Sequence, residues 1–307
     1  MVNGFLQYIR YEKIFSSHTV LSYHTDLRQF LEFLGMTAEN FDPEAVKSTD
    51  IQSWIMHLME SGITARSISR KISVLKSFWR YLLRYHQVKI NPTLKIVLPK
   101  TIKPLPVFFK HREVSEVIDN PFVPDDFVRL RDLLIVETFY MTGIRLSELI
   151  SITDKNLDFS SAELRVIGKR NKERIIPLDM SLCQKMSHYR QLRDAAIGNT
   201  PERFFVRESG KSLYPALVQK IVKRIMSEVS TLSHIGPHML RHTFATELLN
   251  GGADINAVKE LMGHSSLAAT QVYTHTSFKE LYNIYKQAHP RAKLRKGGIY
   301  ETENSVN

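Results

Sequence analysis

The hydrophobic residues in the first part of the chain recur at the spacing of amphipathic helices. Leu27, Phe30, Leu31 and Leu34, for example, fall at i, i+3, i+4 and i+7, and a glycine follows them as a stop signal. The same spacing predicts one helix before this segment and two after it, while the signal for strands is weak. We therefore predict a four-helix N-terminal domain over residues 1–88.

The fourth predicted helix, traced by apolar positions from Ile68 to Leu82, carries a row of cations on its other faces. No Asp or Glu occurs between Thr64 and His86, so pairing at i,i+4 within the helix does not account for these charges. A solvated face is the usual reason for a charge run, but one apolar stripe beside many cations favours a surface that faces phosphates. We predict DNA contact by Arg66, Arg70, Lys71, Lys76, Arg80 and Arg84.

The segment 89–108 interrupts the helical pattern with four prolines, which preclude a continuous helix, and it is also rich in lysine. We predict that it is an extended basic linker between two domains. The sequence leaves open whether this linker touches DNA or only connects the domains.

A mixed pattern begins at residue 109. Phe127–Met141 is apolar on several sides and ends at a glycine, as a buried helix does. Glu163–Gly168 and Glu173–Leu178 have the character of two strands joined by a hairpin turn, and further helical segments follow. We predict an α+β second domain over residues 109–290 with a small antiparallel sheet.

The C-terminal end combines a short helix with a polar tail. Ser277–Gln287 places Tyr282 and Tyr285 with other apolar residues on roughly one face. An apolar face so near the chain end favours docking on a neighbouring copy, although packing within the same chain is the simpler alternative. Residues 291–307 have little apolar content, so we predict a mobile tail.

Charge and composition narrow the functional classes. Lys and Arg number 42 against 31 Asp and Glu, and the net charge of +11 points to a polyanionic partner. Cys183 is the only cysteine, so no intrachain disulfide can form and nothing indicates an oxidising compartment. No apolar run approaches the ~20 residues of a membrane span, and the N-terminus lacks the pattern of a signal peptide. We expect a cytoplasmic protein that does not associate with membranes.

Three stretches concentrate side chains that can act on a phosphate. TGIRLSEL contains Arg145, which follows a glycine turn, although pairing with Glu148 would explain this arginine as well. Pro237 opens a helix on which His238 and Arg241 share a face. The turn KRNK adds two candidate lysines, Lys169 and Lys172. Spacing alone does not choose between these lysines.

LMGHSS followed by TQVYTH, together with these residues, resembles the tyrosine recombinase (phage integrase) family and is close to the Xer-type bacterial recombinases. The resemblance covers about Phe5 to Ala292. It implies a mainly α fold in which a SAM-like core-binding domain precedes an α+β catalytic domain with a small antiparallel sheet. It also selects Lys169, which directly follows the glycine of the strand. The predicted catalytic residues are Arg145, Lys169, His238, Arg241, His264 and Tyr273.

The resemblance implies a role for each of these residues. Arg145 and Arg241 would stabilise charge on the non-bridging phosphate oxygens, and His264 would add a hydrogen bond. Tyr273 would attack the phosphorus and form a 3′-phosphotyrosine link, while Lys169 would protonate the departing 5′ oxygen. His238 would position Tyr273 or accept its proton. We find no carboxylate triad suited to a metal and expect no cofactor.

The resemblance also implies a biological setting. A recombinase of this type cuts and rejoins duplex DNA through a Holliday junction, in a homo- or hetero-tetramer with a related recombinase. The Xer-type likeness indicates chromosome dimer resolution, with a cell-division DNA translocase as a candidate activator. A DNA invertase or a mobile-element integrase uses the same chemistry and stays open. Two alternatives remain: an activity like that of a type IB topoisomerase, and a non-catalytic role in DNA binding.

Overall fold

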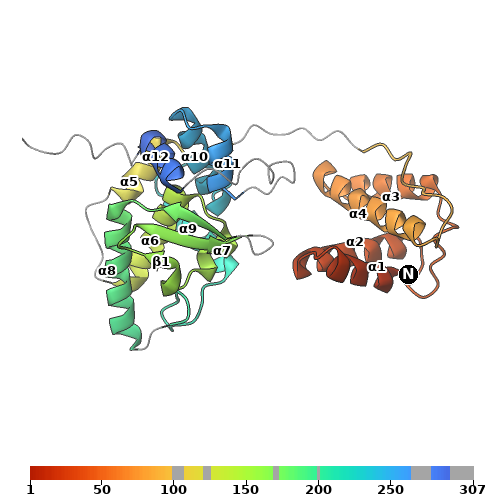
Figure 1. Cartoon of the computed structure of the whole chain (residues 1–307). Helices are drawn as coiled ribbons and strands as arrows, with labels where there is room; N and C mark the ends of the chain where they lie inside the picture. Colours follow the sequence, from red (N-terminus) through yellow and green to blue (C-terminus); the bar gives the residue numbers. More distant parts are fainter. Residues whose placement is uncertain (99–106, 120–125, 169–172, 199–200, 264–277, 291–307) are drawn as a thin grey trace, which may run out of the picture. The chain divides into compact units, whose positions relative to one another are not determined.

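The computed structural model of the chain describes residues 1–98, 107–119, 126–168, 173–198, 201–263 and 278–290 (Figure 1). The chain divides into two compact units, Met1–Leu105 and Pro106–Asn307, and each has its own hydrophobic core. The predicted tail, 291–307, lies outside the described residues, as do the predicted catalytic residues Lys169, His264 and Tyr273. No described helix combines the length and the apolar character that crossing a bilayer would require.

Within residues 1–98, the N-terminal unit has the predicted four α-helices and one short π-helix. They are α1 (Val2–Gln7), the π-helix η1 (Tyr8–Glu12), α2 (Ser17–Phe33), α3 (Ser48–Glu60) and α4 (Ala65–Arg84). The side chain of Ser16 accepts a hydrogen bond from the backbone N–H of Thr19 at 3.2 Å and so caps α2. The apolar faces enclose a core in which Phe30 meets both Trp54 and Trp79 edge-on.

The charges of α4 have a partner that the sequence analysis overlooked. Asp26 of α2 is only 1% exposed and accepts hydrogen bonds at 2.9 Å from Lys71 Nζ and from Arg70 Nη2. Lys71 is itself 7% exposed and also donates to the side chain of Gln29. The sequence excludes acidic partners only within α4, and for Arg70 and Lys71 the partner lies on α2. Lys71 stabilises the packing of α4 on α2 and does not present its charge to solvent.

The other predicted DNA contacts of α4 are more accessible. Arg66, Arg80 and Arg84 are exposed, and Lys76 is partly exposed. Arg70 keeps about half of its side chain exposed beside Asp26. Contact of these five cations with DNA stays a prediction.

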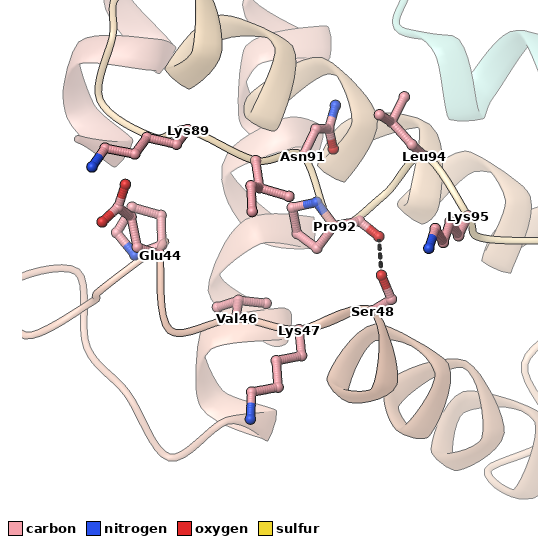
Figure 2. Close-up of a pocket in the computed structure, with 11 residues that line it drawn as sticks. Glu44, Val46, Lys47, Ser48, Lys89, Asn91, Pro92, Leu94 and Lys95 are labelled. Carbon is pink, nitrogen blue, oxygen red and sulfur yellow. Dashed lines mark hydrogen bonds between the residues drawn. The ribbon is translucent and has the colours of Figure 1, made fainter.

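The first part of the predicted linker, 89–98, differs from an extended tether. Ile96 is buried in the core of the N-terminal unit. The Ser48 hydroxyl donates a hydrogen bond of 2.8 Å to the carbonyl oxygen of Pro92 and ties this segment to the start of α3 (Figure 2). Prolines and lysines predicted an extended chain, but Ile96, and in part Leu98, bury apolar surface against the helices, while Ile90, Leu94 and Val97 stay exposed. The remainder, 99–106, lies outside the described residues.

The second unit surrounds the buried helix α6 and contains a small sheet. Its elements are α5 (His111–Ile118), α6 (Phe127–Thr142), α7 (Leu146–Ser151), the 3₁₀ turn η2 (Asp154–Asn156), β1 (Leu157–Asp158), β2 (Glu163–Ile167), β3 (Glu173–Pro177), α8 (Met180–Ile197), α9 (Pro215–Met226), α10 (Pro237–Asn250), α11 (Ile255–Leu261) and α12 (Phe278–Ala288). The strands are antiparallel in the order β1-β2-β3, with Leu164 opposite Ile176. The predicted α+β architecture is confirmed.

Helix α6 contacts α8, α9 and α10, and α10, α11 and α12 contact one another (Figure 1). Within α12, Tyr285 and Ala288 are buried, and the helix contacts α10 of the same chain. This part of the C-terminal helix therefore packs in cis, contrary to the docking in trans that the sequence favoured. The reason is the complementary apolar surface offered by α10, where Phe244 faces the ring of His289 just after α12.

Candidate active site

The junction between α6 and α7 sets the position of the first arginine. Helix α6 ends at Gly143, whose φ of 59° lies in the left-handed region that favours glycine. A Cβ atom there would lie 2.3 Å from the ring of Phe244 on α10, so a larger residue would also push α10 away. Two residues later, Arg145 occupies the N-cap position of α7.

Glu148, buried in the first turn of α7, is the centre of an ion-pair cluster. Its two oxygens accept hydrogen bonds of 2.9 Å from Nη1 and Nη2 of Arg174 on β3, a bidentate pair. They also accept from Nη1 of Arg145 at 2.8 Å and from its backbone N–H at 2.7 Å. Burial alone would raise the pKa of Glu148, but the hydrogen bonds from Arg174 and Arg145 outweigh it and lower the pKa to about 2. Glu148 is therefore a carboxylate at any pH near neutral.

The C-terminal end of α11 joins this cluster. Three successive carbonyl oxygens there each accept a hydrogen bond from a different arginine. The pairs are Leu261 O with Arg174 Nε at 2.9 Å, Met262 O with Arg241 Nη2 at 2.5 Å, and Gly263 O with Arg145 Nη2 at 2.6 Å. The last carbonyls of a helix lack partners within the helix and carry its negative dipole end, so they attract cations. Guanidinium groups from α7, β3 and α10 thus converge on one helix end.

Arg241 is the most buried of the three arginines at 7% exposed, and it also donates to the carbonyl oxygen of Gly143. Burial lowers its pKa, the nearby charge of Arg145 lowers it further, and Glu148 offsets part of the loss, which leaves a pKa of about 10. Arg241 is therefore still a cation at neutral pH, held in a poorly hydrated place where its charge acts strongly on a bound anion.

The structure brings Arg145 and Arg241 together, since they bind adjacent carbonyl groups of one helix end. His238 is exposed in the first turn of α10, three residues before Arg241. The placement of the other predicted catalytic residues is not described. In sequence, however, His264 follows Gly263 directly, and Lys169 lies between β2 and β3.

Sequence reasoning missed Arg174 and misjudged Glu148. It treated a pair between Arg145 and Glu148 as an alternative to a role in chemistry, yet the pair forms and Arg145 still keeps 31% of its side chain exposed. A guanidinium has five N–H groups, and the described contacts engage two of those on the Arg145 side chain. No local pattern marks Arg174 among the basic residues of the hairpin, because its carboxylate partner lies on another element.

The cluster can therefore hold a phosphate between fixed cations. Within the described residues, no three His, Cys, Asp or Glu side chains are grouped so that they could hold a metal ion. The arginines instead offer N–H donors whose positions are fixed by a carboxylate and by backbone carbonyls.

Comparison with known proteins identifies the family. Residues 108–280 match the phage integrase family, and residues 2–86 match the phage integrase N-terminal SAM-like domain. The chain belongs to the phage integrase family. The match to the SAM-like domain falls within the first unit, and the match to the phage integrase family falls within the second.

Relatives of known function extend over nearly the whole chain. The tyrosine recombinase XerC of Chlorobaculum tepidum is 35% identical, and the match covers 94% of this chain and 94% of that protein. The tyrosine recombinase XerC of Staphylococcus saprophyticus is 37% identical, with 94% and 97% covered. Together with the family match, these relatives make the chain a DNA strand-exchange enzyme of site-specific recombination.

Solved structures show the same fold at lower identity. The Tn1549 transposon integrase, solved with transposon right end DNA, has a TM-score of 0.67 at 21% identity, over 92% of this chain and 97% of that one. The XerH recombinase, solved with its difH substrate, has a TM-score of 0.66 at 20% identity, over 92% and 83%. These likenesses confirm the mainly helical recombinase fold.

Proposed function

We propose that this recombinase cuts duplex DNA by attack of Tyr273 on a phosphodiester, which leaves a 3′-phosphotyrosyl link and a free 5′ hydroxyl. The observation that carries this proposal is the convergence of Arg145 and Arg241 on the end of α11. Two fixed cations would stabilise the charge that develops on the non-bridging oxygens. In many other phosphoryl-transfer enzymes, metal ions supply this stabilisation. The covalent link conserves the energy of the phosphodiester, so rejoining needs no ATP.

The other predicted residues complete the proton transfers. Lys169, in the turn between β2 and β3, would protonate the departing 5′ oxygen. His264, which follows the arginine-bound end of α11 in sequence, would donate a hydrogen bond to the phosphate. A tyrosine has an ordinary pKa of ~10, so Tyr273 needs a group that accepts or orients its proton. His238 has the exposed position on α10 that this role requires.

Strand exchange would proceed through a Holliday junction in a homo- or hetero-tetramer with a related recombinase. A lambda integrase tetramer solved on a Holliday junction has the same fold, with a TM-score of 0.61 at 18% identity. From the Xer-type resemblance we infer a role in chromosome dimer resolution in the cytoplasm, with a cell-division DNA translocase as activator. The XerC relatives support the coarser function, site-specific recombination. The transposon integrase likeness keeps mobile-element integration as the alternative.

The N-terminal unit would hold the duplex through the accessible cations of α4. A net charge of +11 supports contact with the DNA backbone. Such phosphate contacts position a protein on the duplex but do not read the base sequence of the DNA.

Covalent trapping on nicked duplexes tests the proposed chemistry. The wild-type protein is incubated, with excess chelator, with a library of nicked duplexes, and the covalently attached DNA is sequenced to recover the site. We expect a chelator-resistant adduct at the 3′ phosphate that Tyr273→Phe does not form. An adduct that persists in Tyr273→Phe, or one that the chelator abolishes, would contradict the proposal.

A further inference from the structure

Arg174 uses its side chain to join three elements of the second unit. From β3 it forms the bidentate pair with Glu148 of α7, and its Nε donates to Leu261 O at the end of α11. Its side chain is 12% exposed, so these bonds lie largely out of water and are strong. Gly263 lies against the same side chain, because a Cβ atom there would be 2.9 Å from Arg174 Nη1.

These contacts link Arg174 to each of the two predicted phosphate-binding arginines through a shared partner, which is Glu148 or the end of α11. Glu148 joins Arg174 directly to Arg145, which it holds by both its side chain and its backbone N–H. The end of α11 joins Arg174 to Arg241 through neighbouring carbonyl groups. If Arg174 were shortened, Glu148 could move toward Arg145 or out of the cluster, and the end of α11 would lose one of its three ties.

We propose that Arg174 is a positioning residue, which fixes Arg145 through Glu148 and the end of α11 so that Arg145 meets the non-bridging oxygens of the scissile phosphate. This inference rests on the proposed cleavage chemistry. Arg174 is assigned a place behind Arg145 because its side chain is 12% exposed, against 31% for Arg145, and because its Nε, Nη1 and Nη2 each donate to a protein oxygen. The rigid fork of a guanidinium binds both carboxylate oxygens and the carbonyl together, whereas a lysine is a single point charge and holds at most part of this set.

The alternative is that Arg174 only stabilises the fold. The test separates the two roles by comparing substrates with and without the negative charge on the scissile phosphate. Each protein receives two nicked duplexes of the recovered site, one with the normal scissile phosphate and one with a methylphosphonate there. The methyl group replaces a charged oxygen, so a guanidinium that acts on that charge has little left to stabilise. Because both rates come from the same preparation, a change in the folded fraction cancels in their ratio.

For Arg174→Lys we expect the single-turnover rate of adduct formation on phosphate to fall by about 10- to 100-fold, as for other residues that orient a site from behind its contacting groups. The rate on methylphosphonate should change far less, and DNA affinity should stay at the wild-type value. In an Arg145→Ala background, Arg174→Lys should no longer change the ratio, because residues that act through one another are non-additive.

Arg131→Lys is the matched control. Arg131 is 5% exposed and also donates two bonds to one carboxylate, Asp132, and one to a backbone carbonyl, that of Val206. It lies eleven residues before Thr142 on α6, about 16 Å along the helix. Arg131→Lys therefore removes a buried guanidinium from the second unit without changing the cluster around Glu148. Its ratio of the rates on phosphate and methylphosphonate should equal that of the wild type.

Two results would overturn the inference. Rates of Arg174→Lys that fall equally on both substrates would mean a structural role alone, and wild-type rates on both would mean that the bonds of Arg174 are dispensable. If the wild-type protein formed no adduct on either substrate, the proposed cleavage chemistry itself would fail, and the role of Arg174 with it.

Discussion

Each unit of the protein contains a carboxylate that is buried between two cations. In the N-terminal unit Asp26 pairs with Arg70 and Lys71, and in the second unit Glu148 pairs with Arg145 and Arg174. The two clusters look alike in composition, and both join elements that are distant in sequence. They differ in what surrounds the cations.

Around Asp26 the ammonium group of Lys71 is enclosed, and its described contacts are Asp26 and Gln29. Around Glu148 the guanidinium groups also bind the end of α11, and Arg145 remains 31% exposed. A cation that is enclosed by protein stabilises packing, whereas one such as Arg145 that keeps exposed surface can also bind a ligand. The charge of a residue in the sequence does not distinguish these cases.

The largest expected effect comes from Asp26→Ala, which would leave Lys71 buried beside an empty site. Removing one partner of a buried ion pair costs about 3–5 kcal/mol. Both tryptophans, Trp54 and Trp79, lie in the N-terminal core, so their fluorescence during urea unfolding follows this unit alone. We expect a lower urea midpoint for Asp26→Ala and no shift in this signal for Glu148→Gln. An unchanged midpoint for Asp26→Ala would remove the claim that this cluster stabilises the fold.

Acid should weaken the second cluster. Glu148 has a pKa of about 2 in the folded chain against 4.5 as the ordinary value, so its stabilisation is complete above pH ~4.5 and is lost as the pH falls toward 2. The difference corresponds to about 3 kcal/mol. Hydrogen exchange of the α6 and α10 amides between pH 5 and 3 should show this loss in the wild type and a shallower pH dependence in Glu148→Gln. Equal slopes in the two proteins would contradict a depressed pKa.

Gly143→Ala tests how closely the cluster is packed. Alanine there must adopt a left-handed φ of 59° and meet the ring of Phe244, and overpacking costs about 1–3 kcal/mol. Gly198 is a matched control, since its φ is 73° at the end of α8 but no atom lies within 4 Å of an added Cβ. Hydrogen exchange in α10 should increase more in Gly143→Ala than in Gly198→Ala. Equal increases would show that only the backbone conformation matters.

The smallest expected effect distinguishes two cations of α4. Arg80 is exposed, whereas Lys71 is buried beside Asp26. If Arg80 contacts a phosphate, Arg80→Ala should reduce the slope of log affinity against log salt concentration by about 0.9. Lys71→Met should leave that slope unchanged. A salt titration of DNA binding measures both, and a reduced slope for Lys71→Met would restore Lys71 as a DNA contact.

The elements that the sequence predicted are those with a strong local signal. The spacing of Leu27 to Leu34 predicted α2, and the glycine after α6 predicted the turn that exposes Arg145. Helix α5 was missed although it has a local signal, since the Glu113 carboxylate accepts a hydrogen bond from the Lys110 backbone N–H at its start. Its short length gives too few apolar positions for a periodic pattern.

The parts that could not be predicted depend on partners far away in sequence. Asp26 with Lys71, and Glu148 with Arg174, meet only once the helices and strands pack. The prediction for α4 examined partners within that helix and so counted Lys71 as accessible. The grouping of Arg145 with Arg241 came from the family resemblance, and the carbonyl groups that hold them at the end of α11 are visible only in the structure.

The most direct test of the contrast between the clusters is the single-turnover rate of 3′ adduct formation by Arg145→Ala on the recovered nicked site, at saturating protein. We predict a fall of about 10²- to 10³-fold relative to wild type, the loss typical of a donor to a developing anion, with wild-type tryptophan unfolding. A wild-type rate for Arg145→Ala would contradict the account, because the Glu148 cluster would then only stabilise the fold, as the Asp26 cluster does.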